Sequence, residues 1–354
     1  MKLITNDVKL VIGCDFHPSF QRIAILDRET GELSKKTLLH GNGEARRFYE
    51  GLRGQSVVVG IESCGNTLWF EQILTEMGHR LVIGDAARIR AHVVRRQKND
   101  DRDALNILEL LETERFPALW VPSPEERDLR ALLLHRFKLV QMRTRIKNQL
   151  QHIALNYGFQ KKRKLWSQEG RKFLQELELP TWTGRRRDDL LKMLEPLDVT
   201  IAELSAAVEK AVEKDARSQL LKTHPGVGPI TALGFVLIIG PVERFARSRQ
   251  VASYLGLIPT EDSSGGRHRW GHISKQGNTF LRTMLVEAGQ TAARKDPELR
   301  RAYQRLKHKK QFSGIAKVMV ARKLAIRLYW MLRTNQPYLP ARMQGSPSHS
   351  VVEV

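Results

Sequence analysis

Residues 57–62 read VVVGIE, an unbroken apolar run that ends in an acid, and this stretch decides the fold of the first part of the chain. An apolar run without polar alternation is typical of a central strand buried on both faces of a sheet. Two further apolar runs, residues 8–13 and 23–26, predict a hairpin that enters the same sheet. The spacing of residues 67–77 predicts a helix, and residues 80–83 predict the next strand. This succession of strands and helices indicates an α/β domain.

The apolar pattern changes near residue 124, where we place the end of the α/β domain. From residue 124 to about 157, apolar side chains recur at intervals of three and four, which predicts one long helix. A second helix with its own apolar stripe is predicted for about residues 189–221, with the polar segment 158–188 as the turn. Residues 125–221 are therefore predicted to form an antiparallel helical hairpin, or coiled-coil linker.

The rest of the chain is predicted to form a helical domain and a tail. Residues 222–333 are rich in glycine at first and then become helical and basic. Residues 334–354 contain three prolines and several serines, and we expect this tail to be disordered. The predicted fold class is thus α/β plus α, with domains 1–124, 125–221 and 222–333 before the tail.

The charge of the chain is large and unevenly placed. The formal net charge is +21, which favours a polyanionic partner, with nucleic acid as the first candidate. Residues 1–125 hold 17 Lys and Arg against 18 Asp and Glu, so the excess lies beyond them. Residues 294–333 hold 13 Lys and Arg against Asp296 and Glu298, which predicts a basic helical surface for phosphates. A ribosome-associated or chromatin-like binding protein has the same charge pattern, so charge does not indicate an enzyme.

The chain shows neither a disulfide framework nor a membrane segment. Cys14 and Cys64 are its two cysteines, and it lacks an apolar signal segment at its start, so we expect a cytoplasmic protein. The longest apolar stretch, around residues 232–242, contains Gly234 and Gly240 and is too short to cross a bilayer.

Four carboxylates carry the first functional hypothesis. Asp15 follows the first predicted strand, Glu62 ends the buried strand, and Asp100 and Asp103 open a helix with a spacing that puts both on one face. Carboxylates at the ends of adjacent strands can converge, and hard cations such as Mg²⁺ prefer oxygen ligands. The four could hold two Mg²⁺ ions about 3.5–4 Å apart, an arrangement that suits phosphoryl transfer.

Each acid also has a simpler interpretation. Asp100 and Asp103 would serve as the acidic first turn of a helix. An ionised Glu62 at the end of an apolar strand, however, is costly without a partner or a metal, which favours the combined site. Cys14 and Cys64 flank this site, and we interpret them as small buried side chains rather than ligands.

A glycine-rich turn carries the second hypothesis. Residues 224–229 read HPGVGP and precede an apolar helix, which resembles the turn of a helix-hairpin-helix element. In such a turn, backbone N–H groups near Gly226 and Gly228 would contact a nucleic-acid phosphate. A plain turn between two helices has the same pattern.

A serine-rich and basic segment carries the third hypothesis. Residues 262–269 read DSSGGRHR, so Ser264 lies beside two glycines on a backbone that a DNA phosphate could approach. The cations predicted to bind nucleic acid around it are Arg267, Arg269, Lys275 and Arg282. Serine is a weak nucleophile unless a base, a metal or cations activate it. From the residues alone, Ser264 could therefore also be an ordinary loop serine.

Taken in order, these motifs resemble the DEDD-type transposases of insertion sequence family one-ten, described as bridge-RNA-guided recombinases. The resemblance rests on five motifs over nearly the whole chain, which are Asp15 after the first strand, GIES at 60–63, the KxDxxDA pattern at 98–104, PGVG at 225–228, and Ser264-Gly265 before ISKxGN at 273–278. It implies a RuvC-like domain of RNase H fold for residues 1–124 and a transposase domain for residues 222–333. One departure is Asn99, where the family often has threonine.

The resemblance also implies a mechanism. Asp15, Glu62, Asp100 and Asp103 would form the tetrad that binds Mg²⁺, and Ser264 would attack the scissile phosphate to give a covalent phosphoserine. The preference for Asp100 over the neighbouring Asp101 rests on this resemblance. Family members are thought to join the acids of one subunit to the serine of another within a tetramer. A structured guide RNA would pair with double-stranded target and donor DNA, so base pairing would supply sequence choice.

Two other functions remain open at the level of the sequence. A RuvC-like nuclease or junction resolvase would hydrolyse DNA with metal-activated water and would not need Ser264. A non-enzymatic DNA- or RNA-binding protein would use the carboxylates only to cap helices and to stay hydrated. Within the serine mechanism, Ser263 competes with Ser264 as the nucleophile.

Overall fold

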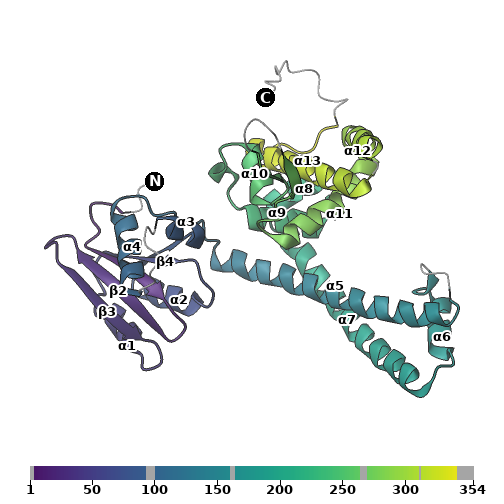
Figure 1. Ribbon diagram of the computed structural model, residues 1–354, viewed down its shortest axis with the longest axis horizontal. Coiled ribbons are helices and arrows are strands. Elements are labelled where there is room, and N and C mark those ends of the chain that lie inside the picture. The colour runs from purple at the N-terminus through teal and green to yellow at the C-terminus, as the bar shows by residue number, and fades with distance from the viewer. Residues whose placement is uncertain (1–3, 93–99, 160–163, 264–268, 311, 341–354) are drawn as a thin grey trace, which may run out of the picture. The chain divides into compact units, whose positions relative to one another are not determined.

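The computed structural model describes residues 4–92, 100–159, 164–263, 269–310 and 312–340 (Figure 1). Contacts divide the chain into two compact units, Met1–Val121 and Pro122–Val354, which we describe separately. The prediction ended the first domain at residue 124, and the contacts divide the chain after Val121. Among the described residues, no helix is both long and apolar enough to cross a membrane.

Unit 1 is built on a mixed five-stranded sheet in the order β3-β2-β1-β4-β5. Its elements in chain order are β1 (Leu10–Phe16), β2 (Phe20–Asp27), β3 (Leu33–Leu39), α1 (Glu44–Glu50), β4 (Val57–Glu62), α2 (Leu68–Glu76), β5 (Arg80–Gly84), α3 (Ala86–Ala91) and α4 (Asp100–Glu112). The strands β1, β2 and β3 pair antiparallel, whereas β4 pairs parallel to both β1 and β5. This mixed α/β arrangement is consistent with the RNase H-like fold predicted from the sequence.

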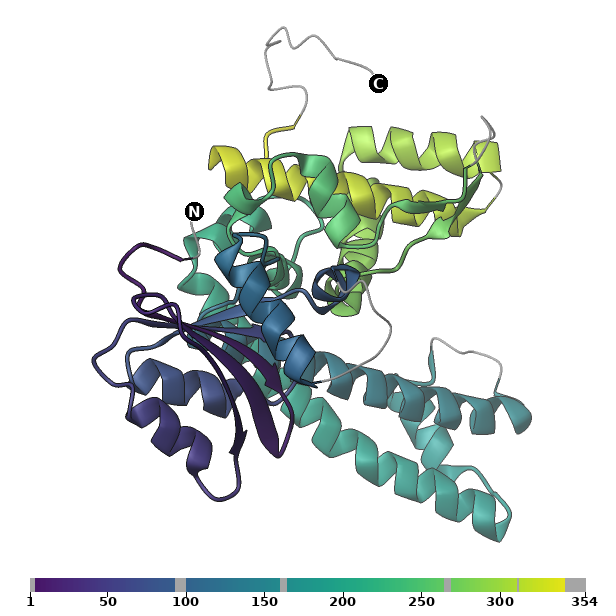
Figure 2. The same ribbon diagram turned by 60° about the vertical axis from the view of Figure 1, so that its left-hand side comes forward.

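Helices cover both faces of the sheet, which explains why its central strands lack polar alternation. On one face, Ile12 and Val59 pack in a core with residues of α1 and α2. On the other face, Val11 and Val58 pack in a second core with residues of α4 (Figure 2). Successive side chains of a strand point to opposite faces, so each central strand contributes to both cores. The buried central strand predicted from VVVGIE is confirmed.

The strand β3 has no counterpart among the runs interpreted as strands in the sequence. It lies at the edge of the sheet and pairs only with β2 among the described strands. Of its seven residues, Leu38 alone is buried, and Lys35 and Lys36 are exposed. An edge strand with solvent on one side tolerates charged residues, so it lacks the apolar signal of a central strand.

Unit 2 is helical apart from one small hairpin. Its elements in chain order are α5 (Pro124–Asn156), α6 (Gln168–Glu176), α7 (Thr181–Glu213), α8 (Ala216–Lys222), α9 (Pro229–Ile239), the 3-10 helix η2 (Val242–Arg244), α10 (Ser248–Tyr254), β6 (Pro259–Glu261), β7 (Trp270–Ile273), α11 (Thr279–Lys295), α12 (Pro297–Lys310) and α13 (Ser313–Thr334). A capping box formed by Ser123 and Glu126 fixes the start of α5.

The helices α5 and α7 form the predicted antiparallel hairpin, with α6 at its far end (Figure 1). Arg136 donates to Ser205 at 2.8 Å, and Arg143 donates to Asp198 at 3.1 Å. Partners that come later along α5 lie earlier along α7, as an antiparallel pair requires.

The boundaries of the second long helix differ from the prediction of about 189–221. The helix α7 begins at Thr181 and ends at Glu213, and the separate helix α8 follows it. Asp215 separates the two, because its carboxylate accepts from the backbone N–H of Ser218 and caps α8. The segment 158–188, predicted as a polar turn, contains α6 and the start of α7. The amphipathic α6 was missed because only nine residues form it.

The main core of unit 2 surrounds α9, which is buried on every side from Thr231 to Ile239. Leu133 of α5 and Val208 of α7 belong to this core, so the base of the hairpin and the C-terminal helices share one packed interior. Arg130 of α5 donates to the backbone oxygen of Leu237. The predicted boundary at residue 221, between the helical hairpin and the C-terminal domain, stays a prediction.

Part of the tail expected to be disordered is ordered. Residues 335–340 are described, and the Tyr338 backbone N–H donates to the Thr223 hydroxyl at 2.9 Å. The Tyr338 ring lies 4.5 Å from the His224 ring, measured between centroids. One anchoring aromatic side chain is enough to hold a short segment that is otherwise rich in proline.

Candidate functional site

Close contact between α4 and the sheet brings the predicted acids of these elements near one another. At Gly13 in β1, an added Cβ would lie 2.2 Å from the backbone oxygen of Ala104 in α4. At Gly60 in β4, it would lie 2.5 Å from a methyl carbon of Leu111. Only glycine leaves room for a helix at this distance, and Ala104 directly follows Asp103. Gly13 therefore lets the first part of α4 lie against the end of β1, and Gly60 lets the last turn of α4 approach β4.

Asp15, His17 and Asp100 form a group of potential metal ligands whose ligand atoms all lie within 4.8 Å of one another. The Nε2 atom of His17 lies 3.1 Å from Oδ2 of Asp15 and 3.8 Å from Oδ2 of Asp100. The imidazole stacks on Phe20, with 4.6 Å between ring centroids, and this packing orients Nε2 toward the two acids.

The environment of Asp15 disfavours its negative charge. Burial raises the pKa of the Asp15 carboxyl above its usual range, and the negative charges of Asp103 and Asp100 raise the pKa further. The hydrogen bond and positive charge of His17 lower this pKa. Several acids close to one partly buried carboxylate form an arrangement that a bound cation would stabilise.

Glu62 lies at the same edge of the sheet but outside this group. Cys14 of β1 is in register with Ile61 of β4, so extending the parallel register by one residue places Glu62 beside Asp15. Its carboxylate forms an ion pair of 3.4 Å with the guanidinium of Arg90. The charges of both acids raise the pKa of the nearby Cys64 thiol, after the larger effect of its own burial.

Asp101 forms an ion pair with a strand of the sheet, and this distinguishes it from the neighbouring Asp100. Its carboxylate forms an ion pair with Arg22 of β2, which also donates to Thr37. The hydrogen bond from Arg22 lowers the pKa of Asp101. Asp100 instead lies near His17, so the two neighbouring acids differ in environment.

The cysteines that flank the acids differ from each other. Cys14 is buried, as expected, and its thiol lies 3.4 Å from the amide oxygen of Gln21. Cys64 was also expected to be buried but is exposed. It follows the strand β4 instead of lying within it, so the sheet does not enclose it.

Sequence reasoning missed His17. Its signal was the spacing, because residues two apart at the end of a strand point to the same side and His17 follows Asp15 by two. A single histidine after a strand is common, however, and only the fold shows that it faces an acid from α4.

The serine-rich segment connects the strands of the hairpin β6–β7. Ser264 and Arg267 lie outside the described residues, as do Lys98 and Asn99. The hydroxyl of Ser263 donates to the carboxylate of Glu261 at 2.8 Å and accepts from the backbone N–H of Arg269 at 3.2 Å. Ser263 therefore uses its hydroxyl to hold the two sides of the hairpin together.

The other cations predicted to bind nucleic acid differ in their surroundings. Arg269 and Lys275 are exposed. Arg282 is half-buried, and its guanidinium donates to the backbone oxygens of Leu255 and Gln276, each at 3.1 Å. These bonds tie α11 to the loops before it, which indicates a structural contribution from Arg282.

The two glycines of the turn between α8 and α9 also differ. Gly226 has a φ of +98°, and an added Cβ would lie 2.6 Å from the backbone nitrogen of Ala292 in α11. Glycine is therefore required there for packing. Gly228 precedes α9 and has nothing within 4 Å of an added Cβ, so a ligand could approach the backbone at this helix end.

Comparisons with known proteins match both parts of the chain. Residues 12–158 match the DEDD family model of IS110 type, described as a transposase, and residues 218–304 match the model described as the transposase IS116/IS110/IS902 family. The first range contains the four acids and His17, and the second contains the turn and the serine-rich segment.

Several curated proteins are similar over much of their length. A probable family 20 transposase of Pseudomonas aeruginosa is 28% identical, over 80% of this chain and 84% of its own. The transposase for insertion sequence element IS1111A of Coxiella burnetii is 27% identical, over 66% of this chain and 65% of its own. The transposase for insertion sequence element IS1328 of Yersinia enterocolitica is 29% identical, over 65% of this chain and 69% of its own.

Proposed function

Because the chain belongs to the IS110 family of DEDD transposases, we propose that it cleaves and exchanges DNA strands with a divalent-metal site and a nucleophilic serine. The metal site would comprise Asp15, Glu62, Asp100 and Asp103, and Ser264 would be the nucleophile. The observation that carries the proposal is the group of Asp15, His17 and Asp100, which lies inside the range matched by the DEDD model.

The described donors fit a divalent cation such as Mg²⁺. Two carboxylates and one imidazole nitrogen lie within 4.8 Å of one another, and the pKa of Asp15 is raised by burial and by acids around it. Asp103 and Glu62 would complete the set, and the set is large enough for two ions. When bound, the cations would neutralise charge on the phosphate and polarise its oxygens.

The serine step is a transesterification. The Oγ atom of Ser264 forms a bond to the scissile phosphorus, and the bond from phosphorus to one sugar oxygen breaks. That oxygen leaves with the bonding electrons and gains, through solvent, the proton that the serine loses. The number of phosphoester bonds stays constant, so a second strand can later displace the serine without an external energy source. Exposed Arg269 and Lys275 would offset the charge of the phosphate.

Ser264 is favoured over Ser263 as the nucleophile. The Ser263 hydroxyl already donates to Glu261 and accepts from the Arg269 backbone. Attack by Ser263 would therefore break both of these bonds, which link the two sides of the hairpin. We therefore assign Ser263 to hold the hairpin and Ser264 to react.

Two variants and one control test this assignment on DNA that carries the ends of the mobile element. Ser264→Ala should abolish a protein–DNA adduct that resists denaturant and is removed by protease, whereas Ser263→Ala should retain it. Asp15→Asn should abolish adduct formation and leave nucleic-acid binding within about threefold. Cleavage to free ends by Ser264→Ala would instead support hydrolysis by metal-activated water.

We further propose that a structured RNA guides the reaction, because the chain's basic excess lies outside its acidic domain. The basic surfaces of unit 2 would hold the RNA and the double-stranded DNA, and base pairing would choose the sequence. The approachable backbone at Gly228 would contribute one phosphate contact. Sequencing the RNA that copurifies with the protein tests this directly. One discrete structured RNA is expected, and a random sample of cellular RNA would refute the guide.

We also propose that the acids of one subunit act with the serine of another in a dimer or tetramer. Asp15 lies in unit 1 and Ser264 lies in the sequence of unit 2. Mixing inactive Asp15→Asn chains with inactive Ser264→Ala chains tests this arrangement. If sites are shared between subunits, the mixture regains part of the wild-type activity, because some sites receive both intact parts. A mixture as inactive as its components would place both parts in one subunit.

A further inference from the structure

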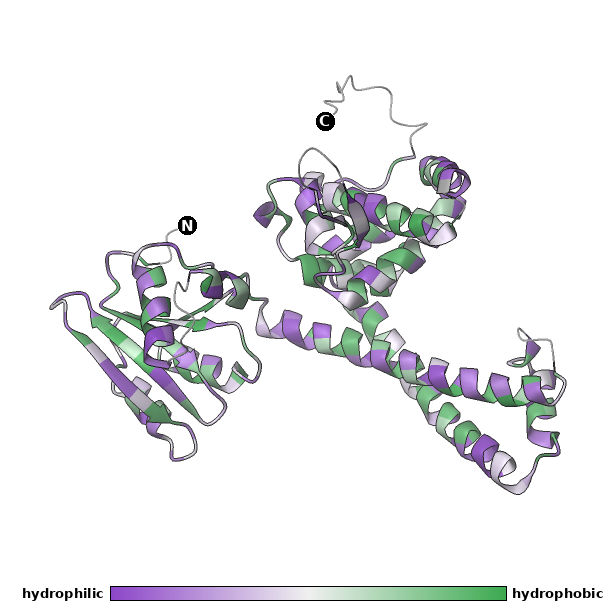
Figure 3. Cartoon of the chain, in the orientation of Figure 1, coloured by the Kyte–Doolittle hydropathy of each residue, from purple (hydrophilic) through white to green (hydrophobic). Residues whose placement is uncertain are grey.

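A basic groove lies between α11 and α12, where the basic segment 294–333 begins, and it includes none of the acids or serines assigned to the reaction. It encloses about 750 Å³. Its lining residues are Gln290, Ala293 and Arg294 of α11 and Arg300, Tyr303, Gln304 and Lys307 of α12. The set holds three cations, two amides and one aromatic ring, with no carboxylate. Figure 3 shows that α12 is largely hydrophilic.

The cations form a continuous face. Arg300 and Lys307 are seven residues apart on α12, so they lie on the same side of the helix about 10 Å apart along its axis. Arg294 faces them from the last turn of α11. In the described part of the chain, none of these three side chains forms an ion pair with a carboxylate.

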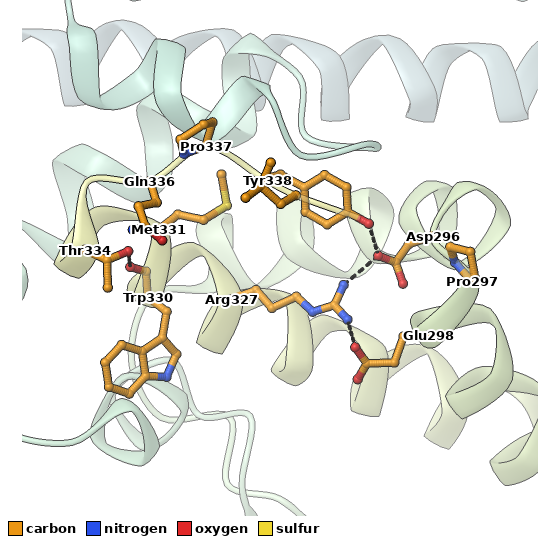
Figure 4. A pocket seen from close by; sticks show the side chains of 11 residues that line it. Asp296, Pro297, Glu298, Arg327, Trp330, Met331, Thr334, Gln336, Pro337 and Tyr338 are labelled. Carbon is orange, nitrogen blue, oxygen red and sulfur yellow. Dashed lines mark hydrogen bonds and ion pairs between the residues drawn. The ribbon is translucent and has the colours of Figure 1, made fainter. Parts of the chain in front are cut away.

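Two neighbouring cations of α13, Lys323 and Arg327, have carboxylate partners, which distinguishes them from the cations of the groove. Arg327 forms ion pairs with Asp296, at 2.7 Å, and with Glu298 (Figure 4). Lys323 lies 3.7 Å from Glu298. The two acids of the basic segment 294–333 are therefore both used by α13. The uncompensated charge that the sequence predicted for this whole segment lies largely on α12 and the end of α11.

The corner between α11 and α12 is held rigidly by one buried acid. Asp296 accepts from the backbone N–H of Leu299 at 2.7 Å and so caps α12, and it also accepts from Arg327 and from the Tyr338 hydroxyl (Figure 4). The guanidinium of Arg300 donates to the backbone oxygen of Arg294 at the end of α11. These bonds connect the two helices that line the groove, and a site whose parts are linked before binding has a lower entropic cost of binding a ligand.

We propose that this groove binds the phosphodiester backbone of a nucleic acid. Arginine and lysine side chains that have no carboxylate partner among the described residues match a row of phosphates, and no acid in the lining opposes them. The 10 Å between Arg300 and Lys307 spans about three nucleotides of a stacked strand, at roughly 3.4 Å each. Gln290 and Gln304 supply amide donors and acceptors between the cations. This inference rests on the proposal that the basic surfaces of unit 2 hold nucleic acid, and it depends on neither the metal nor the serine proposed above.

Charge removal from two faces of the same helix tests the proposal in the full-length protein. The groove variant carries Arg300→Gln and Lys307→Gln. The matched control carries Arg301→Gln and Arg305→Gln, which remove the same charge from exposed residues that do not line the groove. Affinity for RNA, single-stranded DNA and double-stranded DNA of one sequence is measured from 50 to 300 mM salt, and circular dichroism verifies folding.

Losing two phosphate contacts should reduce the slope of log affinity against log salt by about 1.4 on single strands and about 1.8 on a duplex. These slopes correspond to roughly 10- to 30-fold weaker binding at 150 mM salt. The control should change affinity by less than about threefold. Weaker binding of the groove variant to RNA alone, to DNA alone or to both supports the proposal and identifies the nucleic acid that the groove binds. An equal loss of nucleic-acid affinity in the two variants, or an unchanged affinity in the groove variant, overturns the proposal.

Discussion

Replacing Gly13 by alanine should separate the acids of α4 from Asp15 without touching any of them. The added Cβ would lie 2.2 Å from the backbone oxygen of Ala104, and ordinary contact begins at 3.4 Å. Backbone cannot rotate away as a side chain can, so α4 must move by about 1.2 Å. Overpacking of this kind costs about 1–3 kcal/mol of stability. A displacement near 1 Å costs about 100-fold in a reaction that depends on positioning.

Two other glycine variants provide a graded comparison. At Gly60 the obstacle is the flexible side chain of Leu111, so Gly60→Ala should have a smaller effect. At Gly41 nothing lies within 4 Å and φ is ordinary, so Gly41→Ala is the matched control. Mn²⁺ binding by calorimetry, adduct formation on element DNA and thermal unfolding are measured for all three.

The expected order of loss in Mn²⁺ affinity and in adduct formation is Gly13→Ala, then Gly60→Ala, then Gly41→Ala. RNA and DNA binding should stay within about threefold, because the basic surfaces lie in unit 2. A folded Gly13→Ala protein with the metal affinity and activity of the control would refute the idea that helix contact at Gly13 positions the acids.

Three further perturbations concern single side chains. His17→Ala should weaken Mn²⁺ binding by about tenfold and Mg²⁺ binding by less, because imidazole suits transition metals better than Mg²⁺. Both affinities are measured by calorimetry, and equal losses for the two metals would limit His17 to orienting Asp15. Burial holds the pKa of His224 at about 4, so between pH 6.5 and 4 the unfolded chain binds more protons than the folded one. Stability is therefore complete above pH 6.5 and should fall by up to about 3 kcal/mol as the pH drops to 4, and a melting curve of His224→Gln should show a flatter dependence. Tyr338→Phe removes the hydroxyl that donates to Asp296 and should cost about 1–2 kcal/mol in urea unfolding; an unchanged midpoint would contradict the anchoring contribution of residues 335–340.

Much of the fold followed from local patterns. The apolar strands and the 33-residue helix α5 are strong signals, because burial on both faces or along one stripe constrains many residues at once. The edge strand β3 and the nine-residue helix α6 were missed, since few of their side chains contribute to a core. The break between α7 and α8 depends on one capping side chain, Asp215, which a continuous apolar stripe conceals.

For the candidate site, the sequence by itself determined which residue types lie at strand ends and which motifs resemble a transposase. The residue pattern alone could not choose between Asp100 and Asp101, a choice that rested on the resemblance. It also could not find His17 as a partner of Asp15 or separate the functions of Arg282 and Arg269. Those distinctions depend on contacts between residues far apart in the chain, such as Arg22 with Asp101 and Arg282 with the Leu255 carbonyl.

The sequence determined the elements, the acids and the overall charge, because these depend on side-chain chemistry and short-range periodicity. Only the tertiary structure decided which of the basic side chains have a carboxylate partner. Within residues 294–333 it pairs Arg327 with Asp296 and Glu298 and leaves Arg300 and Lys307 without a carboxylate partner among the described residues. The physical reason is that a Coulomb interaction depends on distance in space and on burial, and neither is a property of position along the chain.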